Sequence, residues 1–406
     1  MPRFEPFPGI RFAIGAPALA GASLEDLVTP PYDVISPERR AELAARHSHN
    51  AVHIDLPEAD GNRSPYEVAA ELFGRWQREG ALVRDTEPAF YTYRMDTTDD
   101  VGRPRRTIGV IGALELSRPD EGQVLPHEHT TPKAKSDRLE LLRATRANLS
   151  PIWGLSPAAG LTDLLHDAEI LGRWTGSDGT RHELGRITRP ATIDAIRAKV
   201  ASVPMVIADG HHRYETSLAY RDECRARGGV VGDAGGAELT MTFVVELVES
   251  ELTVLPIHRL LSGLPVGFDL TAALSPWFDV RPVDGPIDAR IMDRMAAAGA
   301  LCLVLPESAA LLVPRPDALG SVRDLDSSRL DVALAELPEH EVTFQHGVEH
   351  VVQRVRQQKA QAGVLLRPVR VEQIAEIANG GDRMPPKSTY FHPKPSTGAV
   401  FRSLDV

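Results

Sequence analysis

The clearest chemical signal in the sequence is the segment ADGHHR at residues 208–213. The apolar run 203–208 predicts a buried strand, and the polar stretch 211–227 after it predicts a helix. A glycine at such a junction permits a tight turn, and the first N–H groups of the helix then form an anion site backed by the helix dipole. Two histidines and an arginine add hydrogen-bond donors, so the segment predicts a phosphate site.

The groups at this junction are expected to have different roles. The expected phosphate and nucleotide ligands are Gly210, His212 and Arg213, and the expected catalytic groups are Asp209 and His211. Asp209 is available to hold Mg²⁺, to orient a histidine or to accept a proton. The alternative is an Asp-Gly turn followed by a helix whose histidines are merely exposed, but four proton-active residues clustered after a buried strand favour the phosphate site.

A second polar cluster, PHEHT at 126–130, precedes several basic residues. In an extended segment its two histidines point to one face and the glutamate to the other, so a two-histidine metal site is geometrically possible. The segment is not HExxH, no further ligand has an obvious spacing, and a charged loop before a solvated helix is as good an interpretation as a metal site. The favoured acid/base or substrate-binding groups are His127, Glu128 and His129, and the cations expected to face anionic oxygens are Lys135 and Arg138.

A third segment, KSTYFHPK at 387–394, places hydroxyl groups between two lysines near the C-terminus. The chain has 39 arginines but only six lysines, and four of these lysines fall in TPKAK and PPKSTYFHPK. A lysine ammonium is a compact point charge that the planar fork of arginine cannot replace where a single phosphate oxygen must be bound. The segment therefore predicts further phosphate ligands, with a proline-rich tail laid over the surface as the alternative. The ligands expected here are Lys387, Ser388, Thr389 and Lys394.

Two weaker motifs complete the set. PPYDVIS at 30–36 predicts a rigid turn that ends in a capped helix, and each of its residues has a structural explanation. PIHR at 256–259 follows a strand and brings another His/Arg pair either to the pocket or to a structural role.

Both helices and strands are predicted around these segments. This combination predicts an α/β (α+β) fold with mixed sheets. Ser64, Pro65 and Glu67 form the start signal of a helix that Gly80 ends. Further helices are predicted at 137–147, 161–174, 191–200, 211–227, 290–298 and 348–361. Strands are predicted at 89–95, 107–116, 203–208, 239–248, 301–305 and 364–366, the first two forming a hairpin.

Composition narrows the class of protein. With 406 residues, 42% hydrophobic and 25% charged, the chain is predicted to be globular and to have two or three domains. The net charge of −11 disfavours nucleic acid as a partner. Two cysteines give no disulfide framework, and no signal peptide or membrane span is evident, so we expect a cytoplasmic protein. The GxSxG elbow, the P-loop, the Rossmann fingerprint and the kinase loop set are missing from the sequence.

Taken in order, PPYDVIS, HEHT, ADGHHRYET, PIHR and MPPKSTYFHPKP resemble the bacterial domain-of-unknown-function family 1015 over nearly the whole chain. The junction at 209–213 is also similar to the phosphate-binding signature of the ParB/sulfiredoxin superfamily, whose members include sulfiredoxin and an archaeal free-serine kinase. That resemblance implies a ParB/sulfiredoxin-like nucleotide-binding core with additional α/β subdomains. No cysteine lies between 209 and 216, so sulfiredoxin's redox activity is not implied.

The resemblance and the motifs together predict a kinase, a phosphotransferase that uses a nucleoside di- or triphosphate and Mg²⁺. Its expected substrate is a small hydroxylated metabolite, free serine being the first candidate because the resemblance implies serine metabolism. A phosphate-ester hydrolase acting, for example, on phosphoserine, and a non-enzymatic nucleotide-binding switch are the alternatives. Three regions are predicted: 1–158 with PPYDVIS and HEHT, 159–265 with ADGHHRYET, and 266–406 with PPKSTYFHPKP.

Overall fold

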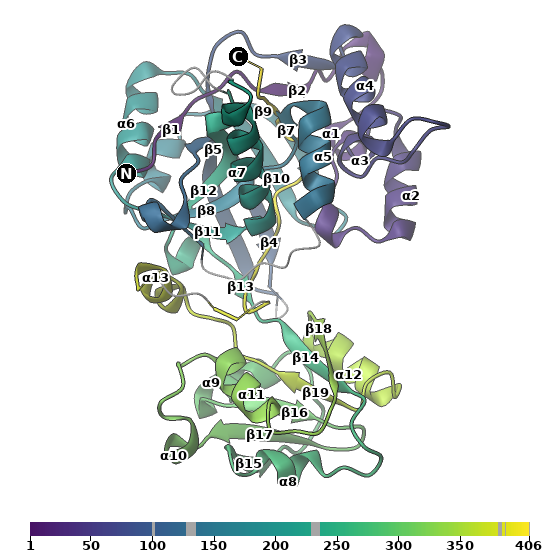
Figure 1. Ribbon diagram of the computed structural model, residues 1–406, viewed down its shortest axis with the longest axis vertical. Coiled ribbons are helices and arrows are strands. Elements are labelled where there is room, and N and C mark those ends of the chain that lie inside the picture. Colours follow the sequence, from purple (N-terminus) through teal and green to yellow (C-terminus); the bar gives the residue numbers. More distant parts are fainter. Residues whose placement is uncertain (100–101, 127–134, 229–235, 381–383, 386, 406) are drawn as a thin grey trace.

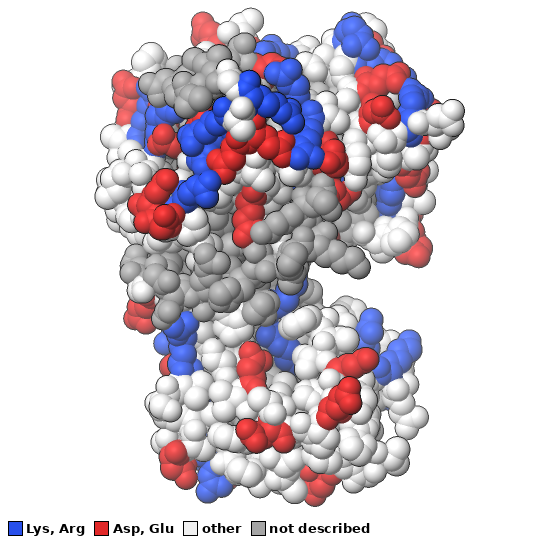
Figure 2. All heavy atoms as spheres, in the orientation of Figure 1, with Lys and Arg blue, Asp and Glu red and all other residues white. Residues whose placement is uncertain are grey.

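The chain forms two lobes, each built around its own sheet (Figure 1). The computed structural model describes residues 1–99, 102–126, 135–228, 236–380, 384–385 and 387–405. We call the part around the nine-stranded sheet the large lobe and the part around the six-stranded sheet, residues 258–366, the small lobe. On the face drawn in Figure 2, acidic and basic side chains alternate over the large lobe, and the surface is hollowed between the lobes.

The sheet of the large lobe is mixed, which confirms the predicted fold class. Its order is β6 (Val124–Pro126), β11 (Met205–Asp209), β8 (Ile152–Ser156), β12 (Leu239–Glu246), β5 (Pro104–Glu115), β4 (Phe90–Thr98), β10 (Arg181–Ile187) and β9 (Glu169–Thr175), and β1 (Phe4–Glu5) also pairs with β5. Two neighbour pairs, β11 with β6 and β12 with β8, are parallel, and the others are antiparallel. Strands from both sides of residue 158 share this sheet, and the division into three regions stays a prediction.

Helices cover the large lobe and set the position of its site. They are α1 (Leu24–Leu27), α2 (Pro37–Arg46), α3 (Val52–Asp55), α4 (Pro65–Arg78), α5 (Lys135–Thr145), α6 (Pro190–Ala201) and α7 (His211–Ala226). α7 follows β11 directly and lies beside α5 (Figure 1). Because β11 is buried and lies in the interior of the sheet, its C-terminal end is a fixed base for the residues that begin α7.

The small lobe has its own sheet and its own hydrophobic core. Its sheet runs in the order β15 (Phe278–Pro282), β17 (Ala309–Pro314), β16 (Leu301–Val304), β19 (Ala362–Leu365), β14 (His258–Ser262) and β18 (Glu341–Gln345). Its helices are α8 (Leu270–Leu274), α9 (Ile291–Ala298), α10 (Pro316–Leu319), α11 (Asp326–Leu334) and α12 (Val348–Arg356). Two apolar clusters drawn wholly from residues 260–366 pack against this sheet.

The C-terminal segment returns from the small lobe to the large one (Figure 1). After α13 (Val371–Asn379), the strand β20 (Tyr390–Phe391) pairs with β13 (Val254–Leu255) between the lobes. Further along, Phe401 bridges to Ile10, and β21 (Arg402–Ser403) pairs with β7 (Ala147–Asn148). A last small pair joins β2 (Ile10–Phe12) to β3 (Leu82–Arg84). The end of the chain is therefore part of the large lobe.

Most predicted elements are confirmed, and two need correction. The predicted helix at 161–174 is wrong: a short 3₁₀ turn at Thr162–Leu165 precedes the strand β9. Glu169–Thr175 pairs with β10 through a turn at Gly179, so strand pairing decides the structure of this segment. The helix predicted at 348–361 ends at Arg356.

Within the described residues, no helix is both long enough and apolar enough to cross a membrane.

Candidate functional site

The site begins where β11 meets α7, as the sequence predicts. Gly210 separates the two elements with a φ of +85°, a left-handed conformation that side chains rarely adopt. A Cβ at this position would lie 3.0 Å from the Nε atom of Arg213, because that guanidinium folds back over the glycine. Glycine is thus required here by backbone conformation and by the approach of Arg213.

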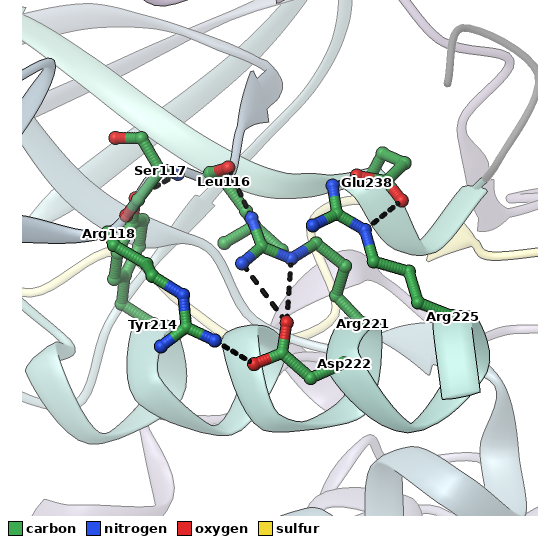
Figure 3. Close-up of polar contacts among 8 residues, drawn as sticks. All are labelled: Leu116, Ser117, Arg118, Tyr214, Arg221, Asp222, Arg225 and Glu238. Carbon is green, nitrogen blue, oxygen red and sulfur yellow. Dashed lines mark hydrogen bonds and ion pairs between the residues drawn. The ribbon is translucent and has the colours of Figure 1, made fainter. Parts of the chain in front are cut away.

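Buried contacts on the far side of α7 hold the helix against the sheet (Figure 3). The Tyr214 hydroxyl donates to the carbonyl of Ser117 at 2.8 Å and accepts from the N–H of Ser117 at 2.9 Å. About two turns further, Arg221 donates to the carbonyl of Leu116 at 2.6 Å. These contacts fix α7 to the end of β5, so the first turn of the helix keeps a constant position relative to β11.

Four charged side chains from three distant segments meet at the start of α7. The Asp209 carboxylate accepts from Arg213 at 2.8 Å and from Lys394 at 2.6 Å, and Lys394 also pairs with Asp33 at 3.2 Å. We call Asp33, Asp209, Arg213 and Lys394 the Asp209 cluster. The segments PPYDVIS, ADGHHR and KSTYFHPK are therefore brought together by the tertiary structure.

Opposing charges fix the ionisation of this cluster. Burial alone would raise the pKa of Asp209, but the neighbouring Lys394 and Arg213 outweigh it and hold that pKa well below the ordinary value. Burial would lower the pKa of Lys394, whose side chain is only 8% exposed, yet the carboxylates of Asp209 and Asp33 raise it. Both groups are consequently charged at neutral pH, and Asp209 is a weak proton acceptor.

A second set of contacts lies beside Arg213. Arg138 is buried and donates to the backbone carbonyl of Asp55 at 2.8 Å, and its guanidinium lies 4.3 Å from the ring centre of Tyr32. Burial raises the pKa of the Tyr32 hydroxyl, so this residue stays protonated. A small cavity of about 60 Å³ is lined by Tyr32, Asp55, Arg138 and Arg213, among others. Arg138 therefore lies near the cluster, with its charge already engaged by Asp55 and the adjacent Asp137.

A larger pocket of about 230 Å³ opens on the other side of Lys394. We call it the Trp174 pocket; it is lined by, among others, Pro30, Pro31, Trp174, His182, Tyr390, His392 and Lys394. The rings of Trp174 and His182 stack with their centres 5.2 Å apart, and His182 contacts the Tyr93 hydroxyl at 3.0 Å. Burial lowers the pKa of His182 to about 4, so its ring is neutral at pH 7. The lining of the pocket therefore includes both aromatic rings and the Lys394 ammonium.

The structure separates the remaining residues of the predicted site. Ser388 is buried and contacts the Ser327 hydroxyl of α11 at 3.1 Å, while the carbonyl of Lys387 accepts from Arg259 at 3.1 Å. Lys387, Ser388 and Thr389 precede β20, and Lys394, after it, contacts Asp209 and Asp33.

Other predicted residues are placed only in part. His211 and His212 lie in the first turn of α7, half-buried, and Lys135 begins α5. His127, Glu128 and His129 lie outside the described residues.

The residues that the sequence interpretation underrated are Asp33, Tyr32 and Asp55. PPYDVIS contained the signal, an acidic residue in a proline-fixed turn, but its fit to a plain structural turn concealed it. The 3₁₀ turn at Tyr32–Val34 now carries one partner of Lys394 and one of Arg138.

The residues present do not fit Mg²⁺ at Asp209. Both carboxylate oxygens already accept hydrogen bonds from cations, one from Arg213 and one from Lys394. Among the described residues, no group of three His, Cys, Asp or Glu side chains could hold a metal ion. Asp209 is better suited to holding two cations in place than to coordinating a metal.

Comparison with known proteins identifies the family. Residues 4–333 match the family described as "Protein of unknown function (DUF1015)". The chain belongs to this family. The match includes Asp33 and Asp209 but ends before the C-terminal segment that supplies Lys394. No curated protein matches the sequence.

Several solved structures have a distant likeness to this family member. A conserved hypothetical protein from Pyrococcus furiosus is 12% identical, with a TM-score of 0.37, over 73% of this chain and 96% of its own. A free serine kinase in complex with AMP is 13% identical, with a TM-score of 0.37, over 70% and 86%. SbnI with a C-terminal truncation, from Staphylococcus aureus, is 11% identical, with a TM-score of 0.38, over 71% and 85%. Likenesses this distant do not establish a shared superfamily or activity, and the ParB/sulfiredoxin-like core stays a prediction.

Proposed function

We propose that the protein is a nucleotide-dependent phosphotransferase that acts on a small hydroxylated metabolite, with free serine as the first acceptor to test. The observation that carries the proposal is the meeting of Arg213 and Lys394 on Asp209 at the start of α7. A helix N-terminus next to two fixed cations is suited to phosphate, because the N–H groups and the ammonium both stabilise negative charge.

In this proposal the phosphates lie against the first turn of α7, which follows Gly210 and begins with His211 and His212. Lys394 borders both this position and the Trp174 pocket, so a substrate in the pocket would present its hydroxyl close to the transferring phosphoryl group. Phosphoryl transfer depends mainly on positioning and on stabilising charge, which these groups supply.

Asp209 is a positioning residue in this scheme. Its low pKa makes it a poor base for an acceptor hydroxyl, but the same charge holds Arg213 and Lys394 in their orientations. The predicted proton acceptors remain His127, Glu128 and His129.

Phosphorus NMR tests the reaction directly. Purified protein would be incubated with Mg²⁺ and L-serine and, in separate samples, with ATP, ADP, CTP or GTP. A new phosphomonoester formed in excess over protein at the expense of one nucleotide is the expected result. Release of inorganic phosphate from phosphoserine alone would replace the proposal with a hydrolase, and nucleotide binding without turnover would replace it with a switch.

A matched pair of lysine variants ties the reaction to the site. Lys394→Met should lower the rate by about 100-fold or more, as the loss of one preorganised charge-stabilising group does. Lys199→Met is the control, since this half-buried lysine on α6 donates to the carbonyl of Ala159 and lies outside the cluster. Equal rates for the two variants would contradict the assignment of Lys394.

A further inference from the structure

A third cavity, of about 390 Å³, lies between the two lobes. Its lining comes from the chain around β13, from α9, from the start of α12 and from residues 368–372. None of the four residues of the Asp209 cluster lines it. The volume falls in the range of small-molecule sites, about 300–1,000 Å³.

The walls of this inter-lobe cavity are mainly aliphatic. They include Leu252, Val254, Leu255, Met292, Ala296, Val348, Val369 and Val371. Such walls favour an apolar body in a ligand, because removing it from water is favourable.

One end of the cavity holds a buried histidine from the PIHR motif. His258, on β14, is 1% exposed, and its Nδ1 atom accepts from the N–H of Leu366 at 3.2 Å. A neutral ring then carries its proton on Nε2. Within the described part of the chain, no residue accepts a hydrogen bond from this Nε2, so the ring offers a donor at the cavity wall.

The start of α12 lies at the same end. Gly347 and Val348 line the cavity, and the first N–H of α12 that finds a carbonyl within the helix is that of Val351, bonded to Gly347. The N–H groups before it, at the positive end of this nine-residue helix, form a site that favours an anion.

The surrounding charges strengthen that preference. Burial lowers the pKa of His346, another lining residue, and the nearby ammonium groups of Lys394 and Lys387 lower it further. Burial lowers the pKa of His258 to about 3, with His346 and Arg259 adding to the effect. Cationic side chains therefore lie near the histidine end of the cavity. Of the acidic lining residues, Glu249, Asp293 and Glu372 are exposed, where water solvates them, and the half-buried Asp99 pairs with Arg105 at 3.2 Å.

We propose that the inter-lobe cavity binds a small amphipathic monoanion, whose apolar body lies against the aliphatic walls and whose carboxylate accepts hydrogen bonds from His258 and the start of α12. The site is separate from the Asp209 cluster, and the proposal does not depend on phosphotransferase activity.

Calorimetric titration with octanoate and with 1-octanol tests both parts of the proposal. The two probes share an apolar body and differ in charge. Octanoate should bind the full-length protein with one site, and 1-octanol should bind at least tenfold more weakly, a difference of about 1.4 kcal/mol. Equal affinities, or no octanoate binding, would overturn the proposal.

Neighbouring alanines on α9 locate the binding. Ala296 lines the cavity and Ala297 does not, and both are exposed, so neither substitution disturbs a core. Ala296→Trp should abolish octanoate binding and Ala297→Trp should preserve it. His346→Gln should weaken octanoate binding several-fold while leaving 1-octanol unchanged. Loss of binding in both tryptophan variants or in neither would place the probe elsewhere and overturn the site.

Discussion

At the scale of single residues, the site depends on how charge and backbone conformation combine at one junction. Gly210 adopts a left-handed conformation and allows the Arg213 guanidinium to lie over it. Arg213 and Lys394 then share the two oxygens of Asp209. Each of these residues limits the positions open to the others, so we expect a change at one of them to affect both stability and the proposed anion binding.

Replacing Gly210 tests the backbone requirement. Gly210→Ala and Gly228→Ala alter positive-φ glycines just before and just after α7, and each should cost about 1 kcal/mol of stability. Only Gly210→Ala adds a Cβ next to Arg213, since nothing lies within 4 Å of the new Cβ at Gly228. Nucleotide affinity should therefore fall about tenfold in the first variant alone, as measured by calorimetry. A similar loss in Gly228→Ala would contradict the role of Arg213.

Asp209 should make stability depend on acid pH. Its folded-state pKa lies below the ordinary 3.8, so the carboxylate stabilises the fold fully above that value and loses its contribution as the pH falls toward the folded-state pKa. Asp209→Asn should destabilise the protein by about 3 kcal/mol at pH 7, because Lys394 loses a partner. Urea unfolding of both proteins from pH 7 down to about pH 3 should show this difference shrinking below about pH 4. A difference that stays constant would rule out the ion pair as its cause.

At the scale of elements, the position of the site depends on α7 being fixed at its buried side. Tyr214 and Arg221 satisfy backbone groups at the end of β5, at Ser117 and Leu116 (Figure 3). These are buried groups that water does not reach, so their loss is costly. The first turn of α7 is consequently more rigid than a surface helix would be.

Paired tyrosine variants measure that contribution. Tyr214→Phe removes a hydroxyl that both donates to and accepts from Ser117, and it should cost about 2 kcal/mol of unfolding free energy. Tyr66→Phe removes an exposed hydrogen bond to Asp137, and its cost should be below about 0.5 kcal/mol. Urea denaturation gives both values. Similar costs for the two variants would show that the Ser117 contacts do not hold the helix.

At the scale of the whole molecule, the two lobes differ in which parts of the chain form their sheets and cores. The small lobe takes its sheet and its two apolar clusters from one continuous stretch, residues 258–366. The large lobe needs both ends of the chain, because Phe391, Val400 and Phe401 are buried in its clusters. Lys394 reaches Asp209 as a consequence of this return of the chain.

Two fragments test this difference. A fragment of residues 256–368 should unfold cooperatively, because it holds the complete sheet and core of the small lobe. A fragment of residues 1–256 should fail to fold, since it lacks the strand β21 and the buried side chains that the later part of the chain supplies to the large-lobe clusters, among them Phe391, Val400 and Phe401. Circular dichroism during urea titration distinguishes the cases. A cooperative transition in the longer fragment would show that the returning segment is dispensable.

The sequence by itself determined the local features of this protein. Apolar periodicity and capping residues predicted α4, the β4–β5 hairpin and the junction of β11 with α7, because those signals act over a few residues. It also indicated which segments carry chemistry, and its motifs pointed to the family. The helix predicted at 161–174 failed because pairing between β9 and β10 overrides a local preference.

Only the tertiary structure decided which of those segments meet. Lys394 contacts residues 185 and 361 positions away along the chain, and no periodicity within a segment encodes such a separation. Asp33 gained its role from that meeting, while Ser388 was drawn to α11 instead. The partners of a charged side chain are set by the packing of whole elements, because burial makes an unpaired charge too costly to keep.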